Sequence, residues 1–142
     1  MKELSTLIRL HRNLVDEHRH RVSQLQNRAE ELAAARRRLD EEFEAERQAA
    51  AGSVEAGMTF LAFVKVMQRR QAQADHAIAH IRAEIMRAEA DLAAAFQDLK
   101  KFELAQEERE RQIKEERRRR ENQMFDEVAA TRHRRAQQEM DG

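Results

Sequence analysis

The chain lacks cysteine, proline, tyrosine and tryptophan, and it has only 3 glycines among its 142 residues. Without cysteine it can form no disulfide or zinc–thiolate site, and it carries no thiol nucleophile. Without proline, no position in the chain forbids a helix. The apolar fraction of 41% is rich in alanine, which buries little surface per residue. A compact globular core is therefore not expected.

The chain also has no excess of charge of one sign, since its 27 basic residues are equal in number to its 27 acidic residues. A nucleic-acid-binding protein needs an uncompensated basic face, so no nucleic-acid partner is expected. The densest apolar run, residues 58–67, includes Lys65 and is far shorter than the roughly 20 residues that span a bilayer. The N-terminal residues show no signal-peptide core. We expect a cytoplasmic protein without direct membrane insertion.

The sequence does contain two long stretches in which an apolar residue recurs every three or four positions. A mean spacing of about 3.5 residues keeps such a stripe on one helix face and winds two helices around each other. The predicted fold class is all-α, an antiparallel two-helix coiled-coil hairpin. The seam residues are Leu4, Ile8, Val15, Val22, Leu25, Leu32, Leu39, Phe43, Phe60, Val64, Met67, Ile78, Ile81, Ile85, Leu92, Leu99 and Phe102.

The only internal glycines, Gly52 and Gly57, lie between the two stripes. We predict one domain with helix one at about 3–50, a turn at about 51–58 and helix two at about 59–138. Gly52 suits the left-handed backbone that ends a helix, and Ser53 can cap the next helix, so a start near Ser53 is the alternative to Thr59. Glycines near the midpoint favour a monomeric hairpin over a parallel homodimer.

The two stripes can pair in two registers, and periodicity alone does not choose between them. In the first, Phe43 meets Phe60 and Leu25 meets Ile78, whereas in the second Leu32 meets Ile78. In either register helix two extends past the start of helix one by roughly 35–40 residues. Acidic and basic residues three or four apart support this overhang as a single solvated helix.

Histidines give the only candidate metal ligands beside the carboxylates. We expect His11 and His18, which fall in the seam, to pack there beside a carboxylate such as Asp91. His76 and His80 have a spacing that can chelate zinc, but they point away from the seam, no cysteine is available and no other histidine is near. Because no catalytic, phosphate-binding or dinucleotide motif is present, neither an enzyme nor a cofactor or metal is expected.

Two surface features are candidates for contact with a partner. The run Arg117–Arg120 places four consecutive residues around a helix axis, so some of them meet any partner that grips this end. Leu61, Phe63 and Val66 flank the seam, and a two-helix hairpin has nothing to bury them. Exposed apolar clusters mark docking surfaces. The alternative is that residues 44–57 fold back over this cluster.

Three segments carry a resemblance to a known family. They are the leucine-rich opening at residues 4–10, continued by 15–17, then Lys101–Leu104, and finally the charged stretch at residues 118–127. In order and layout they resemble FliJ, the coiled-coil protein of the bacterial flagellar type III export apparatus, and its YscO-type injectisome relatives. The tail resembles the flagellar form more than the injectisome form.

In that family a rod similar to the shaft of rotary ATPases inserts into a hexameric export ATPase and promotes hydrolysis. The resemblance implies a FliI-like ATPase, a FlhA-like export gate and export chaperones as partners, with peripheral association at the inner membrane. It implies ATPase contacts at Arg117, Arg118, Arg119, Arg120, Asp126 and Glu127, and gate contacts at Leu61, Phe63 and Val66. The alternatives are an injectisome stalk and a structural coiled coil that homodimerises.

Overall fold

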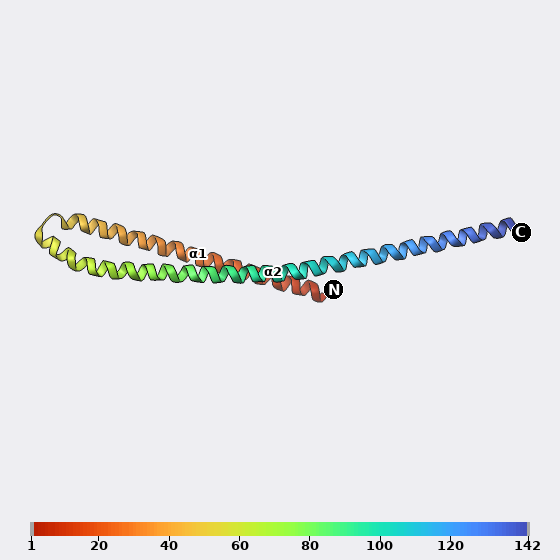
Figure 1. The fold of residues 1–142 in the computed structure, drawn as a ribbon, viewed down its shortest axis with the longest axis horizontal. Coiled ribbons are helices and arrows are strands. Elements are labelled where there is room, and N and C mark those ends of the chain that lie inside the picture. The colour runs from red at the N-terminus through yellow and green to blue at the C-terminus, as the bar shows by residue number, and fades with distance from the viewer. Residues whose placement is uncertain (1, 142) are drawn as a thin grey trace. The chain divides into compact units, whose positions relative to one another are not determined.

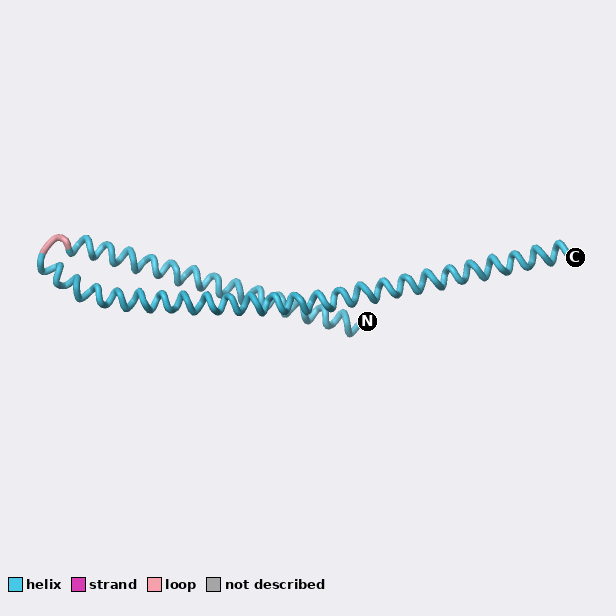
Figure 2. Tube along the Cα trace, in the orientation of Figure 1, coloured by secondary structure: helices cyan, strands magenta, loops and turns pink. Residues whose placement is uncertain are grey.

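The computed structural model describes residues 2–141 and consists of two long helices. Helix α1 spans Lys2–Ala50 and helix α2 spans Val54–Asp141, and a short loop at residues 51–53 joins them (Figure 2). From this loop the helices run side by side in opposite directions (Figure 1). The described residues contain no strand. The predicted all-α helical hairpin is confirmed.

The helices contribute to two compact units. One unit contains residues 11–97, including the loop, and the other contains residues 2–10 of α1 with residues 98–141 of α2. Ile8 and Leu99 are buried in the second unit. Both units therefore contain parts of both helices, although α1 contributes only a short segment to the second.

The core of residues 11–97 lies along the seam. Val22, Leu25, Ile81 and Ala88 form a buried cluster, against which Ala29, Leu32, Ile85 and Leu92 pack. Met67 is fully buried, with 0% of its surface exposed. Over both units, each of the seam residues named above is buried or half-buried in the structure. A spacing of three and four residues is thus enough to orient each helix toward the other.

The middle of the hairpin follows the second register. Leu25 and Ile85 belong to the same core cluster, and these residues face each other when Leu32 meets Ile78. In the first register Leu25 would instead pack on Ile78, which is not a member of that cluster. Leu25 also lines one depression together with Glu84 and Ala88, which lie on either side of Ile85, as the second register requires.

Polar and aromatic contacts between α1 and α2 can also be compared with the two predicted registers. Arg36 Nε donates a hydrogen bond of 2.8 Å to Asp75 Oδ1 across the seam, a pairing that belongs to the second register. Near the loop, the rings of Phe43 and Phe60 lie 5.7 Å apart between centroids, a pairing that belongs to the first. The neighbouring Arg70–Glu42 pair, at 3.5 Å, still follows the second register, so the two rings meet without a change of register in the backbone.

The loop is shorter than the turn predicted at about 51–58, because α2 begins at Val54, in agreement with the alternative start near Ser53 and not with a start at about residue 59. Ser53 Oγ accepts a hydrogen bond of 3.1 Å from the Ala56 amide, and the Ser53 carbonyl accepts one of 3.1 Å from the Gly57 amide. The first bond satisfies an amide that a helix start leaves without a partner, and the second is the first backbone hydrogen bond of α2 itself. The serine cap starts the helix early enough to place Gly57 inside α2.

The end of α1 also differs from expectation. No glycine among the described residues has a positive φ, so the predicted left-handed conformation at Gly52 is wrong. Instead, the Ala51 amide donates to the Gln48 carbonyl and the Gly52 amide to the Ala49 carbonyl, both at 3.3 Å. Each of these amides donates to the carbonyl three residues before it, which tightens the last turn of α1. The bonds satisfy carbonyls that a left-handed cap would otherwise satisfy.

Candidate functional site

The C-terminal part of α2 forms a helix with no apolar cover. Every residue from 116 to 141 is exposed, yet the helix continues to Asp141. Just before and within this stretch, arginines pair along the helix. Arg111 contacts Glu108 at 2.6 Å and Glu115 at 3.0 Å, and Arg120 contacts Glu116 at 2.9 Å. Such pairs three or four residues apart support a helix that lacks tertiary packing.

The predicted arginine run lies within this exposed stretch, which we call the C-terminal stretch (residues 116–141). Arg120 is paired with Glu116, whereas Arg117, Arg118 and Arg119 form no ion pair in the described structure. Since successive helical residues are turned by about 100°, these guanidinium groups point to different sides of the helix. They are available to a partner from several directions.

The other residues of this predicted contact are also exposed. Asp126 and Glu127 lie on α2 one to two turns after the arginine run, and the Glu127 carbonyl accepts a hydrogen bond of 2.9 Å from Thr131 Oγ1. Directly before them in the sequence, Phe125 is 73% exposed and Met124 66% exposed. The stretch therefore offers apolar side chains as well as both signs of charge to a partner.

Sequence reasoning did not single out the second basic run of this stretch, residues 132–135, which reads Arg-His-Arg-Arg. Its signal was present, because residues 128–138 contain no acidic side chain. All four residues are exposed in the structure. Balanced charge over the whole chain hides such local runs.

A second candidate surface lies on α2 beside the loop, where Leu61 is 68% and Val66 54% exposed. Phe63 differs from these two, because it is half-buried and its ring lies 6.3 Å from the Phe60 ring. It also lines a depression of about 300 Å³ together with Ala50 at the end of α1 and other residues of both helices. The expectation that nothing buries Phe63 is therefore wrong.

The alternative cover for this surface is not found. Residues 44–50 continue α1 as a helix, and residues 54–57 already belong to α2. Leu61 and Val66 consequently remain open, and Met58, which is 70% exposed, extends the same apolar region toward the loop. These three side chains form what we call the tip surface.

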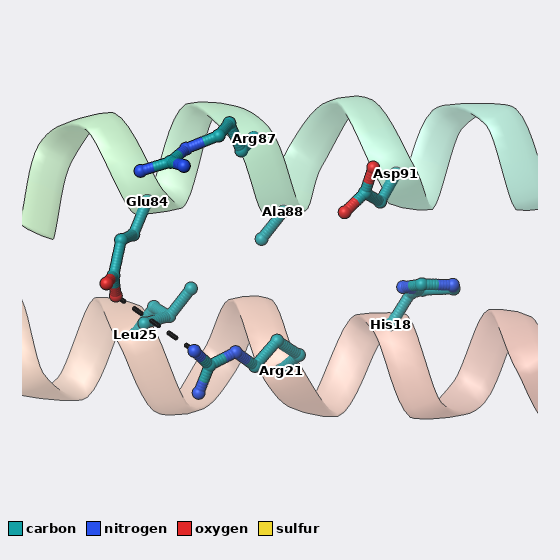
Figure 3. A pocket seen from close by; sticks show the side chains of 7 residues that line it. All are labelled: His18, Arg21, Leu25, Glu84, Arg87, Ala88 and Asp91. Carbon is teal, nitrogen blue, oxygen red and sulfur yellow. Dashed lines mark ion pairs between the residues drawn. The ribbon is translucent and has the colours of Figure 1, made fainter.

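A polar notch interrupts the seam in the middle of the hairpin (Figure 3). It encloses about 280 Å³ and is lined by His18, Arg21, Leu25, Glu84, Arg87, Ala88 and Asp91. Arg21 approaches Glu84 at 4.0 Å across the seam, and His80 Nε2 lies 3.0 Å from the same carboxylate. His18 projects toward Asp91, as Figure 3 shows. Polar groups of this kind specify a register at some cost in stability.

The notch is not arranged as a metal centre. Among the described residues, no group of three or more histidine, cysteine or carboxylate side chains is placed to hold a metal ion. His76, the other member of the spaced histidine pair, is exposed on α2. The Nε2 atom of His80 instead contacts the carboxylate of Glu84 on the same helix. The arrangement links the helices through charged side chains.

The pKa shifts in the structure arise from exposed ion pairs. Two hydrogen bonds raise the pKa of the Arg36 guanidinium, and the bond to Asp75 contributes more than the bond to Asp40. Hydrogen bonds from Arg47 lower the pKa of Glu44, and those from Arg111 lower the pKa of Glu108. Each of these shifts favours the charged form, which suits a structural role more than proton transfer in a cleft.

Comparison with known proteins gives one match. The sequence profile of a family described as flagellar FliJ protein matches residues 1–138. No match was found among curated proteins or among solved structures. Across residues 2–141, neither helix combines the length and apolarity required to traverse a bilayer.

Proposed function

Because the chain belongs to the flagellar FliJ protein family, a non-enzyme family of the flagellar type III protein export apparatus, we propose that it is the stalk of the export ATPase. The C-terminal stretch enters the hexameric ATPase ring and accelerates ATP hydrolysis. One observation carries this proposal: residues 116–141 form a helix that is exposed on all sides. A segment with no partner in its own chain is suited to enclosure by another protein.

The physical properties of this stretch support the same role. A single helix with its side chains is only about 10–12 Å across, so it fits a narrow central channel. Pairs such as Arg120–Glu116 stiffen it without apolar contacts. The unpaired guanidinium groups of Arg117–Arg119 then contact the ring, together with Asp126 and Glu127. Mixed charge lets the helix bind without being held in one position.

The tip surface has a separate role in this proposal. Two of its residues, Leu61 and Val66, dock together with the adjoining half-buried Phe63 on the cytoplasmic part of a FlhA-like export gate. The support is physical, because large apolar side chains that remain exposed on a folded helix favour contact with another protein. Escort of export chaperones and peripheral location at the inner membrane belong to the same role, and they rest on the family relationship.

The test mixes the purified chain with the export ATPase of the same cell and measures hydrolysis. We expect faster turnover with the native chain and loss of the acceleration when Arg117–Arg120 are replaced by alanine. A control variant, L61A/V66A, keeps the acceleration but loses binding to the gate. Circular dichroism establishes that both variants remain helical. Unchanged turnover in the presence of the native chain would contradict the proposal.

A further inference from the structure

The second basic run, residues 132–135, has no partner within its own helix. Neither Arg132 nor Arg134 has a carboxylate three or four residues away in the sequence, and Arg135 has only Glu139. In the described structure none of these arginines forms an ion pair. Arg111 and Arg120, by contrast, each pair with a glutamate of the same helix. The second run therefore keeps its positive charge available.

The arrangement of this run favours one kind of partner geometry. At about 100° per residue, Arg132 and Arg135 lie on neighbouring sides of α2 and Arg134 points away from Arg132, so the three arginines are not confined to one face. A flat surface, such as a membrane or a duplex groove, contacts only the residues on one side. A partner that encloses the helix contacts all of them.

The two basic runs stand at a defined separation. Residues 117 and 132 are about 22 Å apart along one continuous helix, at about 1.5 Å per residue. Between them lie the exposed side chains of Met124, Phe125 and Val128, and the carboxylates of Asp126 and Glu127. The stretch thus presents two basic levels with an apolar and acidic level between them.

We infer that Arg132, Arg134 and Arg135 form a second contact with the export ATPase ring, at a level of its channel lined by carboxylates. This inference rests on the proposed stalk function and adds residues and partner chemistry to it. The channel then has acidic side chains at two levels about 22 Å apart. Complementary charge at both levels favours the inserted state and selects against channels without this spacing.

The experiment titrates the ATPase with the variant R132Q/R134Q/R135Q and measures both the half-stimulating concentration and the maximal rate. We expect the half-stimulating concentration to rise about tenfold, because several exposed charge contacts are lost together. The maximal rate stays unchanged, since the first basic run is intact. Added salt should raise the half-stimulating concentration less steeply for this variant than for the native chain.

Two further variants provide the controls. R37Q/R38Q/R82Q removes the same charge from exposed arginines of residues 11–97, and it should match the native chain. R132K/R134K/R135K keeps the charge and should also remain close to native, because the contact depends on charge. Circular dichroism checks that each variant is as helical as the native chain.

The outcomes separate this inference from the function on which it rests. If the native chain accelerates hydrolysis and the glutamine variant has the same half-stimulating concentration, the second contact is wrong while the stalk function stands. If the native chain has no effect on hydrolysis, the stalk function itself fails. Unchanged stimulation combined with lost binding to anionic vesicles or duplex DNA would assign the run to that partner instead.

Discussion

Residues 11–97 and the C-terminal stretch at residues 116–141 are both helical, but different interactions hold them. The first region buries a seam between α1 and α2, with Met67 fully enclosed. Its charged side chains reach across that seam, as Arg36 does to Asp75 at 2.8 Å and Arg70 to Glu42 at 3.5 Å. The second region buries nothing, and its ion pair joins neighbouring turns of one helix.

This difference separates stability from proposed activity. Burial of apolar surface is the main favourable term in folding, so the seam stabilises residues 11–97. A single helix without packing is marginal and depends on helix propensity and local pairs. Because the C-terminal stretch uses few of its polar groups internally, they remain available for a partner. The region that folds most firmly is therefore not the region that we propose to act.

Replacing Met67 with alanine should have the largest effect on folding. The side chain is completely buried, and loss of such a group lowers the free energy of unfolding by about 2–5 kcal/mol. The matched control is Met86→Ala, because Met86 is 72% exposed and its loss should stay within about 0.5 kcal/mol. Urea unfolding followed by circular dichroism measures both. Equal destabilisation by the two variants would contradict the assigned seam.

A proline in the C-terminal stretch should act strongly but locally. Gln123→Pro removes a backbone amide and clashes with the preceding turn, which costs about 3 kcal/mol in a helix interior. Spin labels at positions 109 and 137 should be about 42 Å apart in the native helix, with a narrow distribution that broadens in the variant. Gln123→Ala is the control and should keep the narrow distribution.

The same proline variant sharpens the contrast between the two regions. Urea unfolding of residues 11–97 should be unchanged, because no seam residue is altered, whereas stimulation of the ATPase should be lost. A variant that stimulates normally despite a broadened distance distribution would show that a continuous helix is not needed for the proposed function.

Acid titration should produce the smallest effects, one in each unit. Arg47 lowers the pKa of Glu44, and Arg111 lowers the pKa of Glu108. Each carboxylate therefore stabilises its helix above the ordinary glutamate pKa, and this contribution is lost as the pH falls through the lowered value. Carbon-13 NMR should find both midpoints below the ordinary range.

Single substitutions test whether these two shifts are independent. Arg47→Gln should return only Glu44 to an ordinary pKa, and Arg111→Gln should return only Glu108. The remaining glutamate serves as the internal control in each variant. A common response of both glutamates would mean that long-range charge, and not the local hydrogen bonds, sets their pKa values.

Much of this structure was predictable because the relevant interactions are local or periodic. The positions of seam residues such as Val22 and Ile81 follow from the spacing of apolar residues, which determines the helix face that becomes buried. The exposure of Arg117–Arg120 follows because residues 114–123 contain no apolar residue that could form a seam. The second basic run, residues 132–135, was equally visible as an acid-free segment, but the balanced total charge concealed it.

Other features depend on contacts that the type of residue at a position does not reveal. Phe63 is half-buried because Phe60 and the end of α1 lie beside it, and its sequence position alone does not reveal this. Gly52 does not use the left-handed conformation that its residue type permits, because bonds within the last turn of α1 close the helix first. In the first case the other helix changes the exposure of a side chain, and in the second the preceding turn sets the backbone conformation.

The amino-acid sequence by itself determined that the chain forms two helices, which of their faces meet, and where charge stays exposed. These properties depend on residue types at spacings of three or four, and such spacings act within a single helix. Only the tertiary structure decided how far one helix is shifted along the other. The two registers bury nearly the same residues, so the choice depends on contacts between helices, such as those of Leu25 beside Glu84 and Ala88 and the Arg36–Asp75 pair.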